Sequence, residues 1–314
     1  MEIEFGVPQG SILGPVLFLI FVNDLSQLAI DCQIEQFADD TQILHTGTAK
    51  ELEFLIKKAE DTLAQAKSYF DKNGLLVNSN KTQCIFIGSR QNIARIPEDV
   101  IIRFGSSNIK PNICVKNLGV YFDQYMTFER HIDEMHKKTM GSLIYLNRVK
   151  NMISADVRVV LVQALALSYL NYCPNIWGTT NKTQLHRVQK LQNFAAKVAI
   201  GKGKKYDRAT PFIEQLNWLK IDKKCMLNTC ILTYKILNKL LPEWLIAFSM
   251  VGDTNPVLTR QREDLVVPRT LTVTGERGVK ALGPKLWNAL PLHIRNSSSL
   301  NVFKNKVTIL IKEQ

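Results

Sequence analysis

The sequence has few of the features that mark secreted, membrane and zinc-binding proteins. Its 314 residues contain six cysteines, none of them in a CxxC or other metal-ligand spacing, so we expect reduced thiols in a reducing compartment. The main apolar run, residues 12–22, is too short to span a bilayer and contains Gly14-Pro15. Residues 1–4 lack the basic start of a signal peptide. We therefore expect an intracellular protein, in the cytoplasm or nucleus, without a membrane partner.

Repeats, low-complexity tracts and protease-type metal motifs are also absent from the sequence. His131 and His136 lack the H-E-x-x-H arrangement of a metallopeptidase. The chain does have 46% hydrophobic and 22% charged residues, which is enough to bury a core and too apolar for a disordered chain. Its length allows one large domain or two ordinary ones.

Acidic residues become scarce after the first quarter of the chain. Residues 1–80 contain 5 Lys and Arg against 12 Asp and Glu, whereas residues 81–314 contain 35 against 16. The whole chain has a net charge of +12. A long basic region that follows a short acidic region predicts a polyanionic partner and a metal site at the acidic end. The alternative is a basic protein with no role in nucleic-acid binding.

The spacing of apolar residues predicts an α+β fold that becomes mostly helical after about residue 127. A buried helix is expected over residues 11–29, with Ser11 as its N-cap. An amphipathic helix is expected over residues 49–72, ended by Asn73-Gly74. Further helices are expected at 128–151, 155–172, 181–200, 222–240 and 299–312.

Strands are expected mainly in the first part of the chain. Residues 32–37 and 41–45 predict a β-hairpin because apolar, strand-forming residues flank a short polar turn. Two short strands are expected at 75–77 and 84–87. A strand pair is expected from 100–104 and 113–122. Strand candidates within the loop-rich region 252–278 are Val266-Val267 and 271–273.

Phe37-Ala38-Asp39-Asp40 is the most informative stretch, because it places two adjacent carboxylates at the expected hairpin turn. Adjacent like charges repel each other unless a divalent cation neutralises them. Mg²⁺ prefers oxygen ligands, and polymerases hold it with one or two carboxylates together with substrate phosphates. Asp39 and Asp40 are therefore candidate magnesium ligands. For an isolated Asp-Asp pair, a solvated turn is the ordinary interpretation.

Several motifs accompany the acidic pair in a definite order. Residues 6–15 read GVPQGSILGP, and Asn23-Asp24-Leu25 follows them. Downstream are Asn73-Gly74-Leu75, Asn78-x-x-Lys81-Thr82 and the segment 115–123, VKNLGVYFD. This order resembles the reverse transcriptase of non-LTR retrotransposons, the LINE-like and jockey-like elements. The ordered recurrence argues against a third reading, a plain basic protein whose motifs are coincidental.

The resemblance implies an RNA-directed DNA polymerase that adds nucleotides to a primer 3′ end by a two-metal mechanism with Mg²⁺. Asp39 corresponds to the metal-binding first Asp of the family's acidic pair, and Asp40 to its neighbour. Phe37 stands in place of the family's more frequent Tyr, and so keeps the aromatic ring without the hydroxyl. The implied partners are an RNA template, a DNA primer duplex and a dNTP.

The resemblance also implies substrate contacts outside the acidic pair. Gln9 and Gly10 match the segment that lies against the templating base and the incoming nucleotide, where glycine lets the backbone approach closely. Lys81 matches the lysine near the triphosphate, whose ammonium would offset charge on the leaving pyrophosphate. Leu118 and Gly119 match the turn that grips the primer end. Taken singly, these residues would be assigned to a loop before a helix, a solvated lysine and a plain hairpin turn.

Three regions follow from the resemblance. Residues 1–125 correspond to a partial reverse transcriptase palm, 126–245 to a helical thumb-like and connection region, and 246–314 to the C-terminal region of retroelement proteins. Basic residues on the thumb-like helices would neutralise phosphates of a template–primer duplex. Each basic run alone is more often a solvated helix face. These residues are Lys137, Lys138, Arg148, Lys150, Arg187, Lys190, Lys197, Lys202, Lys204 and Lys205. Trp287 is expected in the core rather than stacked on a base.

The family's endonuclease domain, its fingers and the strand with its first catalytic Asp find no match before Gly6. Glu2 and Glu4 are not expected to replace that Asp, because they directly precede the PQG segment. We therefore expect a reverse transcriptase fragment that is catalytically incomplete by itself. The alternative is a non-enzymatic nucleic-acid-binding remnant, which would bind duplexes in a salt-sensitive manner without needing Asp39.

Overall fold

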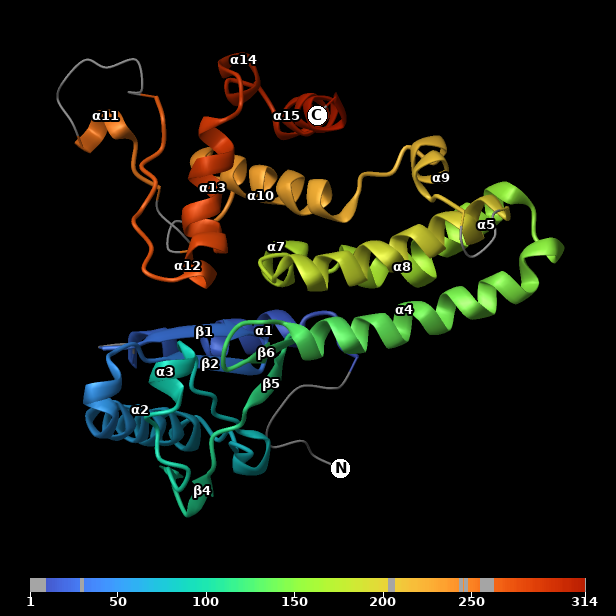
Figure 1. The fold of residues 1–314 in the computed structure, drawn as a ribbon. Coiled ribbons are helices and arrows are strands. Elements are labelled where there is room, and N and C mark those ends of the chain that lie inside the picture. The colour runs from blue at the N-terminus through green and yellow to red at the C-terminus, as the bar shows by residue number, and fades with distance from the viewer. Residues whose placement is uncertain are drawn as a thin grey trace. The chain divides into compact units, whose positions relative to one another are not determined.

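The computed structural model divides the chain into two compact units, Met1–Val115 and Lys116–Gln314 (Figure 1). Each unit is described by itself. The structure describes residues 10–28, 31–202, 207–242, 245, 248–254 and 263–313. Mixed helices and small antiparallel sheets confirm the predicted α+β class.

The first unit begins with two short helices in place of the single buried helix predicted over residues 11–29. Helix α1 spans Gly14–Phe21, and the 3₁₀ helix η1 spans Asn23–Leu28. Pro15 fits only the first turn of a helix, so α1 starts three residues later than expected. The Ser11 hydroxyl still accepts a hydrogen bond from the Gly14 backbone at 3.2 Å. The predicted burial is wrong, since Gly14 is the buried residue of α1 and its apolar side chains are largely exposed.

A hairpin follows, as predicted. Strand β1, Gln33–Phe37, pairs antiparallel with β2, Asp40–Leu44, in the register Gln33 to Leu44 and Phe37 to Asp40. The register leaves a two-residue turn, which is the tightest connection between antiparallel strands. The carboxylates therefore lie at the tip of the hairpin.

The predicted amphipathic helix is confirmed as η2, Ala49–Glu51, followed by α2, Leu52–Lys72. The Gly74 backbone adopts φ +68°, and Leu75 N donates to Phe70 O at 2.8 Å. These are the features of a Schellman motif, so Gly74 ends the helix as expected. The apolar face of α2 packs on a small core centred on Ile102, Phe104 and Ile109.

The strand predictions after α2 are partly wrong. Residues 75–77 and 85–87 form no strand, and Cys84 makes one isolated bridge to Pro111. Between and after them are the short helices η3, Ser79–Lys81, and α3, Arg90–Ile93. Residues 100–104 and 113–122 do not pair with each other. Each segment instead contributes to a separate hairpin between strands that are neighbours in the sequence, because a tight turn that contains glycine reverses the chain direction. Strand β3, Ile102–Phe104, pairs with β4, Ser107–Ile109, and β5, Cys114–Asn117, pairs with β6, Val120–Asp123.

The second unit is mostly helical, and its five predicted helices are confirmed. They are α4 (Glu129–Val149), the run α5–η5–α6 (Ala155–Val162, Gln163–Leu167, Ser168–Asn171), α8 (Lys182–Ile200), α10 (Ile221–Leu237) and α15 (Leu300–Glu313). Segment η5 is a π-helix, which the sequence did not indicate. The shorter helices are η4 (Lys150–Met152), α7 (Pro174–Trp177), α9 (Thr210–Gln215), α11 (Val251–Thr254), α12 (Val273–Arg277), α13 (Val279–Asn288) and α14 (Leu292–Arg295).

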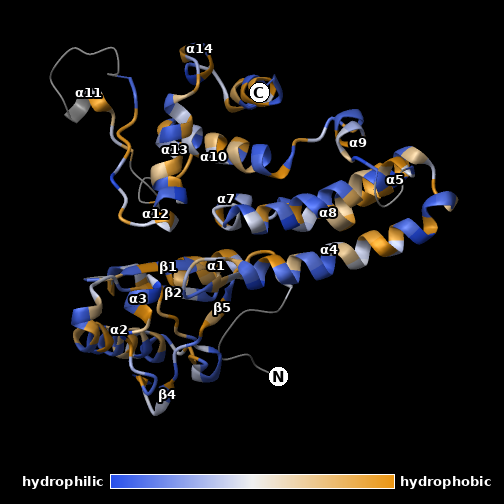
Figure 2. Cartoon of the chain, in the orientation of Figure 1, coloured by the Kyte–Doolittle hydropathy of each residue, from blue (hydrophilic) through white to orange (hydrophobic). Residues whose placement is uncertain are grey.

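Two large hydrophobic cores, and a smaller cluster of Ala196, Ala209 and Ile213, stabilise the described part of this unit. In the first, α4 and α8 lie side by side and pack with α5 and η5 around Ile132, Leu143 and Leu191 (Figure 1). Figure 2 shows hydrophobic and hydrophilic residues alternating along α4 and α8, as expected for helices with one buried face. In the second, α10 packs against α13 and α15. Helix α10 contributes Ile221 to the first core and Tyr234 to the second, and so joins them.

Trp287 lies in the second core, as predicted. It is 5% exposed and packs beside Tyr234 and Phe303. Helix α13, which carries it, was not predicted, because Pro284 lies inside it and proline normally argues against a helix interior. All six cysteines are free thiols. Within the described ranges, no helix is both long enough and apolar enough to cross a membrane.

Candidate functional site

The hairpin tip presents both acidic side chains to solvent. Ala38 and Asp39 form the two-residue turn, and Ala38 adopts φ +53°, in the left-handed region that non-glycine residues rarely occupy. Asp39 and Asp40 are exposed, and the Phe37 ring beside them is 64% exposed. The turn therefore holds Ala38 in a costly backbone conformation and leaves both carboxylates facing solvent.

The donor atoms at this tip suit a hard divalent cation. Mg²⁺ usually keeps several waters and takes one or two protein carboxylates, which Asp39 and Asp40 would supply. In the part of the chain that the structure describes, no group of three His, Cys, Asp or Glu side chains comes together to hold a metal. Asp39 and Asp40 are therefore not joined by a third such side chain among these residues.

Gly10 adopts φ +88°, a conformation that favours glycine. A Cβ added there would meet nothing within 4 Å, so the requirement for glycine comes from the backbone and not from crowding within the chain. Its predicted partner in substrate contact, Gln9, lies outside the described residues.

Lys81 ends the single turn η3 and its side chain is exposed. The Asn78 side chain caps this turn by accepting a hydrogen bond from Asn80 N at 3.1 Å. Thr82 Oγ1 donates to Asn78 O at 3.2 Å. The Asn78-x-x-Lys81-Thr82 motif therefore fixes the backbone that carries the lysine. Among the described residues, Lys81 forms no ion pair with Asp39 or Asp40.

Leu118 and Gly119 form a tight turn between β5 and β6 in the second unit. Both have positive φ angles, +43° and +85°, as a two-residue hairpin of the primed type requires. The Tyr172 hydroxyl donates a hydrogen bond to Leu118 O. A Cβ on Gly119 would approach the Tyr172 ring to 3.3 Å, so glycine lets the turn pack against Tyr172, the residue after α6.

Asp123 is an organising residue that the sequence analysis did not single out. Its carboxylate accepts hydrogen bonds from Tyr125 N, Thr127 N, Thr127 Oγ1 and Phe128 N at 2.7–3.0 Å. These bonds hold the turn before α4, in which Met126 and Phe128 both have positive φ. A signal was present in the sequence, since Asp123 closes the VKNLGVYFD motif a few residues before α4.

Asp24, in the Asn-Asp-Leu motif, has a structural partner. Its carboxylate accepts a hydrogen bond from the Tyr69 hydroxyl on α2. Burial, followed by this bond and the carboxylate charge, raises the pKa of Tyr69 to about 12. The Asn-Asp-Leu motif thus ties η1 to α2.

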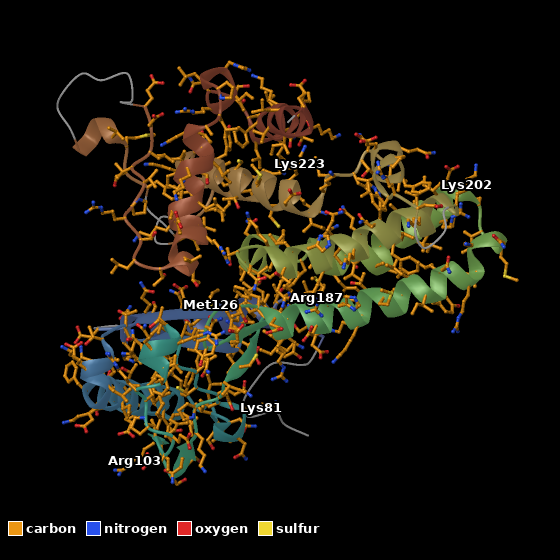
Figure 3. The ribbon with its side chains drawn as sticks, viewed as in Figure 1. Lys81, Arg103, Met126, Arg187, Lys202 and Lys223 are labelled. Carbon is orange, nitrogen blue, oxygen red and sulfur yellow. The ribbon has the colours of Figure 1, made fainter. Side chains whose placement is uncertain are left out.

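The basic residues of the second unit differ in how freely they could meet a phosphate. Lys137 is paired with Glu134 at 2.8 Å, and Arg187 with Asp133 at 2.7 Å. Three other basic side chains are exposed: Arg148 on α4, Lys190 on α8, and Lys202 just after α8. Figure 3 labels Arg187 and Lys202. Two further predicted residues, Lys204 and Lys205, lie outside the described residues.

Comparison with known proteins agrees with the motifs. Residues 2–140 match the family model described as reverse transcriptase (RNA-dependent DNA polymerase). The RNA-directed DNA polymerase of the mobile element jockey from Drosophila funebris is 28% identical over 60% of this chain and 21% of its own length. The Pol polyprotein of the type-1 retrotransposable element R1 from Nasonia vitripennis is 24% identical over 72% of this chain and 68% of its own length. No solved structure matches the chain significantly.

The chain is similar to the reverse transcriptase family over residues 2–140. Its relatives are the RNA-directed DNA polymerases of non-LTR retrotransposons, including jockey, R1 and the X-element of Drosophila melanogaster, which is 23% identical over 64% of this chain. The matched part spans about a fifth of the length of the jockey and X-element proteins.

Proposed function

We propose that the chain forms part of an RNA-directed DNA polymerase in which the hairpin tip holds magnesium at a growing DNA end. The observation that carries this proposal is the exposed Asp39-Asp40 pair on a strained two-residue turn, in a segment that matches the reverse transcriptase family. Bound metal ions would stabilise charge on the attacking and leaving oxygens of nucleotidyl transfer.

The remaining site residues position the substrate in this proposal. Gln9 and Gly10 contact the templating base and the incoming nucleotide, and Phe37 is a further substrate-binding residue. Lys81 lies along the triphosphate, where an ammonium stabilises the pyrophosphate leaving group. Leu118 and Gly119 hold the primer end, and the rigid anchoring of their turn by Tyr172 supports a positioning role.

The larger regions take the family's roles in the same proposal. Residues 1–125 act as part of the palm, 126–245 as the thumb-like and connection region that follows the RNA–DNA duplex, and 246–314 as the C-terminal region of retroelement proteins. The exposed basic residues of α4 and α8 support duplex binding, because lysine and arginine release counterions when they neutralise phosphates.

This chain alone is proposed to lack polymerase activity. Two metal ions need carboxylates from more than one strand, and in the described residues no third acidic side chain joins Asp39 and Asp40. The same observation favours the second candidate, a nucleic-acid-binding remnant without catalysis.

Primer extension and duplex binding together test these proposals. An RNA template with a DNA primer, four dNTPs and Mg²⁺ is expected to give salt-sensitive binding without extension. Robust synthesis that Asp39→Ala abolishes would contradict the proposed inactivity and support the metal role. Absence of duplex binding at about 50 mM salt would contradict both candidate functions.

A further inference from the structure

A groove on the second unit is not used by the proposed chemistry. It lies between α4 and the run η5–α6, and its cavity volume is about 380 Å³. The lining residues are Gly141, Ser142, Tyr145, Leu146, Ala164, Leu165, Ser168 and Tyr169. Two walls of this groove carry tyrosines, small side chains lie between them, and none of its eight residues is acidic.

Both tyrosine side chains are exposed to solvent. Tyr145 on α4 is 66% exposed, and Tyr169 on α6 is 39% exposed. Exposed aromatic rings that face a groove provide flat apolar surfaces with polar tips, as found at binding sites. The small side chains between the rings leave room for a flat group to enter.

Two features that weaken regular helices occur at this groove. Gly141 lies inside α4, where glycine is less favourable than every other residue except proline. A Cβ at Gly141 would meet nothing within 4 Å, so packing within the chain does not require glycine there. The facing wall contains the π-helix η5, and π-helices are rare and often occur at functional sites.

Positive charge accompanies the aromatic rings. Lys138 Nζ lies 5.9 Å from the centre of the Tyr169 ring, and its side chain is exposed. Arg148 is exposed three residues after Tyr145, on the same side of α4. A ligand that suits both features has a flat aromatic group and a negative backbone.

We propose that this groove binds an unpaired base of a single-stranded nucleic acid, stacked on Tyr145 and Tyr169, with Lys138 and Arg148 on the flanking phosphates. Stacking on aromatic side chains is the common means of holding single strands, and it tolerates any base. The inference deepens the proposed function and rests on it for the presence of nucleic acid.

Gly141→Leu is the central test, because the added side chain would fill the groove without meeting other atoms at its Cβ. Binding is compared for a blunt RNA–DNA duplex, the same duplex with a six-nucleotide single-stranded extension, and the free single strand. The wild-type chain is expected to bind the extended duplex about 5- to 100-fold more tightly than the blunt one. Gly141→Leu is expected to remove this gain while its thermal stability stays the same or rises.

Tyrosine variants separate stacking from general apolar contact. The double variant Tyr145→Leu with Tyr169→Leu is expected to lose the gain, whereas Tyr145→Phe with Tyr169→Phe keeps it. A 5-iodouridine in the extension is expected to photocrosslink to Tyr145 or Tyr169, located by mass spectrometry. An equal gain in wild type and Gly141→Leu, or crosslinks confined to other residues, would overturn the proposal.

Binding of the free single strand, compared with binding of the blunt duplex, tests the groove separately from the proposed polymerase function. Failure of the blunt duplex to bind, together with Gly141-dependent binding of the single strand, would contradict the polymerase proposal and support the groove. Binding of the blunt duplex without any effect of the extension would leave the polymerase proposal standing and overturn the groove.

Discussion

At the scale of single residues, Arg158 shows how a buried charge is used for structure. Its side chain is 8% exposed and donates hydrogen bonds to the backbone oxygens of Ala199, Ile200, Lys150 and Ile153 at 2.7–3.2 Å. Two of these acceptors lie at the C-terminal end of α8, where the helix dipole favours a cation. Arg158 thus satisfies carbonyls that would otherwise be buried without partners.

Arg158→Met is expected to lower the free energy of unfolding by about 3 kcal/mol, because it removes one buried and three partly buried hydrogen bonds to backbone carbonyls. Gly201→Ala is expected to destabilise by the same route, since its Cβ would lie 2.5 Å from Arg158 Nη2 at a backbone φ of +76°. Chemical denaturation measures both changes. The exposed Arg148→Met is the control, and equal stability of Arg158→Met and Arg148→Met would contradict the assigned role.

The buried His131 predicts a pH dependence of stability. Burial, followed by the charge of Lys138, lowers its pKa below the ordinary value of about 6.5. The folded state therefore disfavours the protonated form, and the free energy of unfolding is expected to fall as the pH drops from about 6.5 toward the folded-state pKa.

Denaturation at pH 7.5 and pH 5.5 measures this effect, and His131→Leu is expected to reduce the difference in stability between the two pH values. His186→Gln, at an exposed position of α8, is the control. His45 also has a lowered pKa, caused first by burial and then by Lys58, so part of the pH dependence is expected to remain in His131→Leu. An unchanged difference in His131→Leu would contradict the argument.

Sequence reasoning at this scale identified residues by chemical type and missed those defined by contacts. The acidic pair stood out because adjacent like charges repel each other. Gly74 stood out because a left-handed backbone conformation favours glycine. Arg158 looked like an ordinary helix residue, because its acceptors on α8 lie more than forty residues away.

At the scale of elements, the turn before α4 depends on one carboxylate. Asp123→Ala is expected to remove four hydrogen bonds and destabilise the second unit by about 2–4 kcal/mol, while Asp123→Asn retains part of the effect. Thermal or chemical denaturation measures the loss, with Asp156→Ala on α5 as the control. A change in Asp123→Ala below 0.5 kcal/mol would count against this role; this threshold is about the ordinary effect of a surface substitution.

The helices were predicted more accurately than the strand pairing, for a physical reason. The periodicity of α2 or α8 records a buried face over about five turns, whereas strands of three or four residues carry almost no pattern. Strand partners depend on turns such as Leu118-Gly119, whose positive φ angles fold each strand onto its neighbour. The exposure of α1 is a tertiary property, and its apolar sequence alone predicted burial.

At the scale of the whole molecule, the proposed binding to nucleic acid is expected to depend on charge. The chain has a net charge of +12, and residues 81–314 carry all of the basic excess. For a contact with about four phosphates, affinity for an RNA–DNA duplex is expected to fall on the order of 100-fold between 50 and 200 mM salt.

Lys190→Gln with Lys202→Gln is expected to reduce the slope of log affinity against log salt by about one to two units. Lys280→Gln with Lys312→Gln removes the same charge from α13 and α15 and serves as the matched control. Titration of a labelled duplex at several salt concentrations gives the slopes. Equal slopes in the two double variants would show that total charge, and not the α8 region, determines binding.

The central claim is that the hairpin tip binds a divalent cation, and iron-directed cleavage tests it most directly. Fe²⁺ with ascorbate, in place of Mg²⁺, produces hydroxyl radicals that cut the polypeptide backbone beside the bound ion. Cleavage is predicted within a few residues of Asp39 and Asp40 in the presence of primer–template duplex and dNTP, competed by Mg²⁺ and lost in Asp39→Asn with Asp40→Asn. Glu35→Gln, on β1, is the control and should leave the cleavage unchanged. Cleavage elsewhere only, or the same cleavage in the double variant, would contradict the claim.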